Sequence, residues 1–182
     1  MTLFKKINSK TSDRVLSLTF WDMGEKMDER KELFASLFDE VKHIVDGPAE
    51  MDEKLSSICR LFLERVPHYH WVGFYLVEEP GKRELVLGPF AGEPTEHVRI
   101  PFGRGICGQA AEKEKTMVVQ DVSKETNYLS CSPRVRSEIL IPIFKHGVIV
   151  GELDIDSHDL SPFTEEDRKF LEQVCELISG LF

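Results

Sequence analysis

The chain has 182 residues, of which 41% are hydrophobic and 30% charged, and its formal net charge is -9. This is the composition of an ordinary globular protein, and the length suits one domain with a short appendage. The acidic balance argues against a general nucleic-acid-binding protein, because such proteins concentrate Lys and Arg to neutralise phosphates.

No stretch of the sequence predicts export or membrane insertion. Residues 1–10 lack the apolar run of a signal peptide, and no later segment approaches the ~18 apolar residues of a membrane span. We therefore expect a cytoplasmic protein without membrane contact. Its four cysteines then predict no disulfide framework, and none are spaced as C-x-x-C, which removes the strongest zinc and thioredoxin-type signals.

Three amphipathic helices are predicted, two near the start of the chain and one at its end. In each of them apolar residues recur at steps of three and four, and Gly47-Pro48 and Pro67 end the first two. Cys59 and Cys175 lie in these apolar stripes, where a cysteine is usually a small buried hydrophobe. The predicted helices span residues 28–46, 51–66 and 164–181, with an N-terminal extension at 1–28 and the domain at 29–182.

Between these helices, segments rich in β-forming residues are separated by turn residues. Two antiparallel hairpins and two brief strands result, and Gly103, Gly105 and Gly108 lead into a short helix at 106–114. This order predicts an α+β domain with a central, mostly antiparallel sheet. The predicted strands span residues 70–77, 84–90, 98–101, 117–119, 138–144 and 148–156.

Carboxylates alternate with apolar residues in the last predicted strand. Glu152, Asp154 and Asp156 are spaced by two, so their side chains point to one face of the sheet. A three-residue loop from Lys145 to Gly147 pairs apolar residues with each other and places Glu138 opposite Asp154. We therefore expect Glu138, Asp154 and Asp156 to converge on one concave face.

Clustered carboxylates share protons, which raises at least one pKa and makes a neutral acid available near pH 7 for acid catalysis or for holding a cation. The simpler interpretation of such residues is a solvated sheet face. A hard metal ion is a competing occupant, but no histidine lies at a recognisable ligand spacing, and we predict no metal.

Two cysteines lie where the sequence favours a thiolate. Cys107 is predicted in the first turn of a helix beside Arg104, where free N–H groups and the helix dipole stabilise negative charge. Cys131 lies in a loop, with Arg134 and Arg136 nearby in sequence. Together with the carboxylates, these thiols suggest a redox cycle in which one thiolate attacks, becomes a sulfenic acid and is captured by the other.

The sequence resembles the GAF-domain free methionine-(R)-sulfoxide reductases from about residue 28 to residue 182. The segments that carry the resemblance are WVGFYLVEE, LVLGPFAGEP, VRIPFGRGICG, SEILIPIF and VGELDIDS. The resemblance implies a six-stranded antiparallel sheet with helices packed on it, a homodimer, and reduction of the free amino acid with thioredoxin as electron donor. It implies no cofactor.

The resemblance also implies two paired active cysteines, three acids that hold the substrate's ammonium group and act near the sulfoxide oxygen, and an aromatic wall around the methyl group. We assign attack to Cys131 and resolution to Cys107, because Cys131 lies on the loop that leads to Glu138. The matching positions are Cys131 and Cys107 for the thiols, Glu138, Asp154 and Asp156 for the acids, and Trp71 for the wall.

Two places depart from the family's pattern. His97 stands where members commonly carry a third cysteine, and Ser132 to Arg136 replaces the run that usually precedes SEI. The altered loop weakens the interpretation as an enzyme, which we still prefer, and leaves open an alternative function of a different class, a non-catalytic GAF sensor domain that binds a small amino-acid-like ligand.

Overall fold

The structure, a computed structural model, describes residues 20–79, 81–129 and 132–182. Within these residues four α-helices and six strands follow one another in the predicted order, and two short 3-10 helices, which were not predicted, lie between or after them. They are α1 (Phe20–Asp46), α2 (Met51–Arg65), β1 (Trp71–Leu76), β2 (Glu84–Ala91), β3 (Arg99–Pro101), α3 (Gly105–Lys113), β4 (Met117–Val119), η1 (Val122–Lys124), β5 (Ser137–Lys145), β6 (Val148–Ser157), α4 (Glu165–Ile178) and η2 (Ser179–Leu181).

The helices differ from the prediction mainly at the start of α1, which begins at Phe20 rather than at Asp28. Its apolar stripe starts only at Leu33, so periodicity could not reveal the turns before it. α4 begins at a capping box in which Thr164 and Asp167 each accept the other's backbone N–H. Among the described residues, no helix combines the length and the apolar character needed to cross a bilayer.

The six strands form one sheet in the order β3-β2-β1-β6-β5-β4, and neighbouring strands are antiparallel throughout. The predicted α+β architecture with a six-stranded antiparallel sheet is therefore confirmed. β1 and β6 lie at its centre, where Trp71 pairs with Asp156. The start of β1 and the end of β6 thus meet at one end of the sheet.

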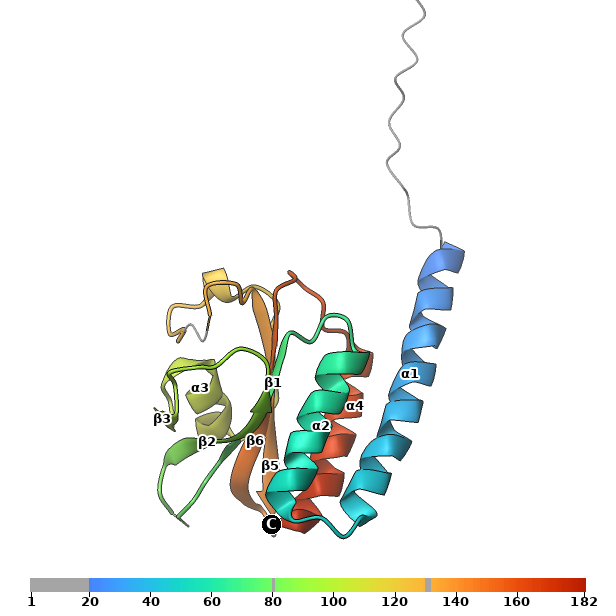
Figure 1. Cartoon of the computed structure of the whole chain (residues 1–182). Coiled ribbons are helices and arrows are strands. Elements are labelled where there is room, and N and C mark those ends of the chain that lie inside the picture. Colours follow the sequence, from blue (N-terminus) through green and yellow to red (C-terminus); the bar gives the residue numbers. More distant parts are fainter. Residues whose placement is uncertain (1–19, 80, 130–131) are drawn as a thin grey trace, which may run out of the picture.

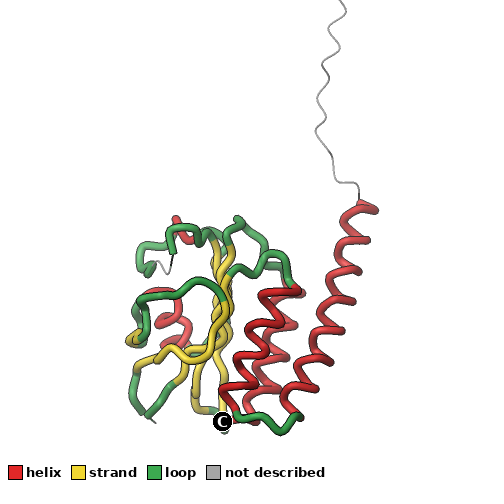
Figure 2. Tube along the Cα trace, viewed as in Figure 1, coloured by secondary structure: helices red, strands yellow, loops and turns green. Residues whose placement is uncertain are grey.

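The two faces of the sheet carry different layers. α2 and α4 pack on one face, with α1 against these two helices on their outer side, and α3 lies on the other face with the loops that flank it (Figure 1; Figure 2). β5 divides its side chains accordingly: Ile139 and Ile141 join the core under the three helices, whereas Leu140 joins a second core with α3. Cys59 and Cys175 are buried in the first core, as predicted.

The β5–β6 hairpin has a two-residue turn instead of the predicted three-residue loop. Lys145 pairs with Val148, and the residues between them, His146 and Gly147, have φ values of 51° and 78°. Positive φ at both positions is what a type I′ turn requires. A turn of this length, without further adjustment, would direct Glu138 to the apolar face.

A β-bulge in β6 removes this offset. The register shifts between Ile143 and Phe144, and Val150 is the extra residue on β6. Beyond the bulge Glu138 pairs with Asp156, so the predicted pairing of Glu138 with Asp154 is wrong by two residues. A shift of two leaves every side chain on its face, because the side-chain period of a strand is two.

Asp167 connects three parts of the helical layer. Its buried carboxylate accepts hydrogen bonds from Arg30 of α1 at 2.7 Å, from His68 at 2.7 Å and from the Tyr69 hydroxyl at 3.0 Å. Burial on its own would raise the pKa of Asp167, but hydrogen bonds from His68 and Thr164 outweigh it and the pKa is lowered. The segment that leads into β1 is thereby tied to both α1 and α4.

Candidate active site

Glu138, Asp154 and Asp156 lie together on the sheet face that α3 covers. Each offers a carboxylate oxygen within 4.8 Å of the other two. Their exposed fractions are 2%, 0% and 1%, so the cluster is a buried site and not a solvated sheet face. Residues from two strands thus converge where the sequence predicts that they do.

Burial is the largest cause of a raised pKa at all three acids. The negative charge of Asp156 raises the pKa values of Glu138 and Asp154 further. The pKa of Asp156 rises to about 7, although the neighbouring Glu138 carboxyl group lowers it in part. The cluster therefore retains protons at neutral pH, which equips it to donate one.

Several oxygens of the cluster have no hydrogen-bond partner among the described residues: Glu138 Oε1, Asp154 Oδ1 and both carboxylate oxygens of Asp156. Buried polar atoms in folded proteins are rarely left unpaired. A ligand with several N–H donors, such as a primary ammonium group, fits these acceptors. Carboxylates also suit a hard cation such as Mg²⁺ or Ca²⁺, whereas the three acids lack the nitrogen and sulfur ligands that zinc favours.

A fourth carboxylate, Glu152, belongs to the same ladder. It is fully buried, and neither of its oxygens has a hydrogen-bond partner among the described residues. Burial and the charge of Asp154 raise its pKa, and a contact from the Cys107 thiol opposes this shift. The spacing of the last strand predicts that Glu152 shares this face, but the predicted site contains only Glu138, Asp154 and Asp156.

Cys107 lies in the first turn of α3 with its thiol directed at the acids. It is 6% exposed, and its Sγ donates to Asp154 Oδ2 at 3.5 Å. Arg104, expected to stabilise a thiolate here, is exposed. α3 can approach the sheet closely because a Cβ on Gly108 would lie only 2.4 Å from the Pro101 carbonyl oxygen. The thiol therefore meets carboxyl groups and acts as a hydrogen-bond donor.

Trp71, the predicted aromatic wall, stands at the start of β1 next to Asp156. Its ring stacks on Phe90 with centroids 5.6 Å apart, and its Nε1–H donates to the Glu93 carbonyl at 3.0 Å. Gly73 makes room for the indole, because a Cβ there would lie 2.2 Å from the ring. The ring is fixed on both sides, and only 6% of the residue is exposed.

Cys131, the predicted nucleophile, lies outside the described residues, and its pairing with Cys107 stays a prediction. The described chain on either side of it reaches the site. Leu129 packs at Gly105, where α3 begins, and Ser132 lines a small pocket together with Asp156 and Trp71. The loop that departs from the family's pattern therefore borders the acid cluster.

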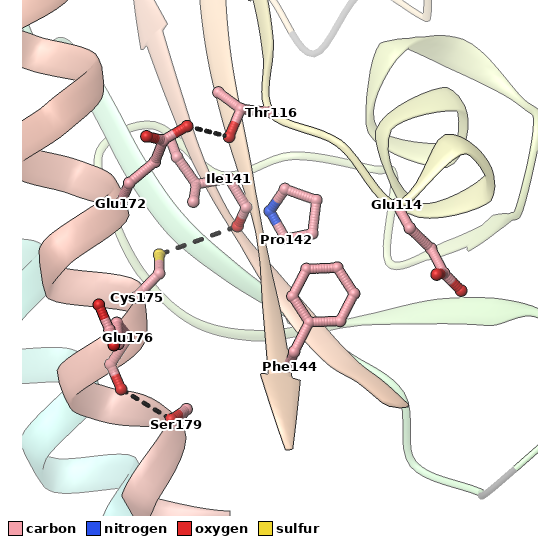
Figure 3. A pocket seen from close by; sticks show the side chains of 9 residues that line it. All are labelled: Glu114, Thr116, Ile141, Pro142, Phe144, Glu172, Cys175, Glu176 and Ser179. Carbon is pink, nitrogen blue, oxygen red and sulfur yellow. Dashed lines mark hydrogen bonds between the residues drawn. The ribbon is translucent and has the colours of Figure 1, made fainter. Parts of the chain in front are cut away.

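A separate hollow of about 330 Å³ lies between α4 and the β5 edge of the sheet (Figure 3). Cys175 lines it, but its Sγ donates to the Ile141 carbonyl at 3.8 Å, and burial raises the pKa of the thiol. Glu172, on the same side, accepts from the Thr116 hydroxyl at 2.7 Å. Cys175 and Glu172 are thus both engaged in hydrogen bonds, so the hollow offers no reactive thiol.

The GAF domain family model matches residues 48–181. The chain is 35% identical over 145 residues to the free methionine-R-sulfoxide reductase of Escherichia coli, covering 80% of this chain and 86% of that protein. It is 38% identical over 136 residues to the enzyme of the same name from Saccharomyces cerevisiae, covering 74% and 75%.

Among solved structures, the fold is similar to that of the free methionine-R-sulfoxide reductase from Neisseria meningitidis in complex with its substrate. The TM-score is 0.79 at 36% identity, and the similarity covers 84% of this chain and 90% of that one.

Proposed function

Because the chain belongs to the GAF-domain free methionine-R-sulfoxide reductase family, we propose that it reduces free methionine-(R)-sulfoxide to methionine. The observation that carries the proposal is the buried cluster of acids that retain their protons, with the Cys107 thiol hydrogen-bonded to Asp154 of this cluster. An acid that is neutral at pH 7 is what a leaving sulfoxide oxygen needs, and a thiol is the reductant.

The substrate would lie against the acids and Trp71. Glu138, Asp154 and Asp156 offer unpaired carboxylate oxygens to its ammonium group, and the indole of Trp71 offers an apolar surface to its methyl group. In this pose the sulfoxide oxygen is within reach of a protonated carboxylic acid. Asp156, with its pKa raised to about 7, is our candidate for the proton donor.

The proposed reaction has three steps. The Cys131 thiolate attacks the sulfoxide sulfur while the acid protonates the oxygen; methionine leaves, and the oxygen remains on Cys131 as a sulfenic acid. The Cys107 thiol then displaces this oxygen as water and forms a disulfide with Cys131. Thioredoxin finally reduces the disulfide and returns both thiols.

Glu152 lies against the Cys107 thiol that forms the disulfide in the second step. Its raised pKa favours the neutral, protonated carboxyl group, so Glu152 adds no negative charge beside the thiol, and the proton of Cys107 leaves with the sulfenic oxygen as water. A thioredoxin-dependent cycle needs a reducing compartment, so we also propose a cytoplasmic location. We further propose that the protein is a homodimer. Its domain spans residues 29–182 and follows an N-terminal extension.

A coupled assay tests the enzyme proposal. The purified protein is incubated with methionine-(R)-sulfoxide, thioredoxin, thioredoxin reductase and NADPH, and methionine and NADPH are both followed. We expect Cys131→Ser to form no methionine, and Cys107→Ser to form about one equivalent and then stop. Cys59→Ala, a change in the other core, should retain turnover. Turnover by Cys131→Ser at the rate of the unaltered protein would overturn the proposal.

The comparisons do not favour the alternative of a non-catalytic sensor. The same experiment separates the two functions, because a sensor would bind the amino acid without forming methionine. Calorimetric binding of methionine-(R)-sulfoxide by a protein that leaves NADPH unconsumed would support the sensor.

A further inference from the structure

Two histidines lie side by side near Asp156 of the acid cluster. His70 directly precedes β1 and His158 directly follows β6, and the pairing of Trp71 with Asp156 brings these two ends together. The imidazole rings are stacked, with centroids 4.2 Å apart and an angle of 18° between their planes. Both histidines are partly exposed, and both line the same pocket as Asp156 and Trp71.

The backbone determines which nitrogen of His70 carries the proton. The His158 backbone N–H donates to His70 Nδ1 at 3.1 Å. A backbone amide can only donate, so Nδ1 must be the unprotonated acceptor, and the ring proton resides on Nε2. The Ser157 hydroxyl lies 3.5 Å from the same Nδ1. His70 is therefore held as a donor with Nε2–H as its donating group.

The pocket brings both imidazoles close to a carboxyl group and a guanidinium group. Asp156 of the acid cluster lines the pocket together with His70 and His158, and Arg134 is close enough to His158 to affect its pKa. Burial lowers the pKa of His158, and the charge of Arg134 lowers it further. Glu93 also lines the pocket, but its carboxylate forms an ion pair with Arg134, which occupies both groups.

An α-amino acid carries groups that match the carboxyl groups and the imidazoles. Its ammonium group suits the unpaired carboxylates, and its α-carboxylate then needs N–H donors a short distance away. Arg134 is paired with Glu93, and the Trp71 Nε1–H donates to the Glu93 carbonyl, so among the described nitrogen donors around the pocket the imidazoles are the ones we consider for this carboxylate. The stacked His158 ring holds the His70 ring in place and shields one of its faces from water.

We propose that the His70–His158 pair binds the α-carboxylate of the amino-acid substrate, with His70 Nε2–H as the donor. The proposal rests on the proposed function for the identity of the ligand, but it concerns recognition and not turnover. It makes these two histidines determinants of specificity for a free amino acid over one whose carboxylate is blocked.

Binding to non-reacting protein tests the proposal. The Cys131→Ser protein is titrated calorimetrically with L-methionine-(R)-sulfoxide and with its primary amide, at about pH 6.5, where most of the α-amine is protonated. We expect the acid to bind at least about 10-fold more tightly than the amide, since a hydrogen bond to a charged group contributes about 10- to 100-fold.

His70→Phe keeps an aromatic ring for the stack and removes the donor. It should weaken binding of the acid by about 10- to 100-fold and leave the affinity for the amide unchanged. His70→Gln, which restores an N–H donor, should recover part of the preference. His43→Phe, on the exposed side of α1, is the matched control and should change neither affinity.

Equal losses for acid and amide in His70→Phe, or no preference for the acid in the unaltered pocket, would overturn the inference. The coupled assay distinguishes this outcome from failure of the proposed function. A protein that binds the acid through His70 but forms no methionine retains the inference and loses the enzyme. A protein that forms methionine while His70→Phe weakens both ligands alike retains the enzyme and loses the inference.

Discussion

Replacing Asp167 by Asn removes an acceptor that three donors share inside the helical layer. The carboxylate accepts from Arg30, His68 and Tyr69 at 2.7, 2.7 and 3.0 Å, and its side chain is 0% exposed. Asn keeps one oxygen but turns an NH₂ group towards neighbours such as Arg30 that only donate. Because breaking a buried charge pair costs about 3–5 kcal/mol, we expect the free energy of unfolding to fall by that amount.

Urea unfolding followed by circular dichroism at pH 7 measures this loss. The control is Glu40→Gln, which breaks the exposed ion pair with Arg65 and should cost no more than about 1 kcal/mol. Acid adds a second readout. The folded-state pKa of Asp167 is lowered from the ordinary 3.8, so its stabilisation is present above that value and is lost as pH falls through the folded pKa.

The unaltered protein and Asp167→Asn should therefore approach each other in stability as the pH falls below about 4. A loss smaller than about 1 kcal/mol at pH 7 would refute the reasoning, because it would mean that the donors find other partners or water at little cost.

Three further predictions follow from the core and the site. Gly73→Ala places a Cβ 2.2 Å from the Trp71 ring, so we expect a loss of about 1–3 kcal/mol in urea unfolding and a higher KM; an unchanged KM would argue against Trp71 as a substrate wall. Burial raises the pKa of Cys59 to about 12, so iodoacetamide at pH 8 should leave Cys59 unlabelled in mass spectra of the folded protein, and rapid labelling would contradict its buried state. The pKa of Asp156 is raised from 3.8 to about 7, so its contribution to stability is complete below the unfolded-state pKa of 3.8 and is lost as pH rises through about 7. At pH 8 the Asp156→Asn protein should therefore be more stable than the unaltered protein by an amount on the order of 1–4 kcal/mol. Equal unfolding midpoints in urea would count against this.

The order of helices and strands could be predicted because each element carries its own periodicity or turn residues. The strand register could not be predicted, because it depends on a β-bulge whose position no residue type in the sequence indicates. Val150 is an ordinary strand residue, yet as the extra residue in β6 it moves the partner of Glu138 from Asp154 to Asp156. Glu138 still lies on the predicted face of the sheet only because side chains in a strand repeat every two residues.

The acids of the candidate site could be predicted from the sequence, but the groups that surround the Cys107 thiol could not. Sequence proximity suggested Arg104 as the partner of Cys107, but neighbours along a helix start point in different directions, and the thiol faces Asp154 instead. The stacked pair of His70 and His158 was beyond sequence reasoning. Its members lie far apart in the chain and meet only because β1 and β6 are adjacent.

The bulge at Val150 also separates the hairpin into a tip and a body that can be engineered independently. A Cβ on Gly147 would have no atom within 4 Å, and Val148 is 59% exposed, so the tip projects from the domain. A peptide tag inserted between His146 and Gly147 lies on the far side of the bulge from the acids. The end of the hairpin thus provides an attachment point for labelling or immobilisation that leaves the carboxylates on the same face of the sheet.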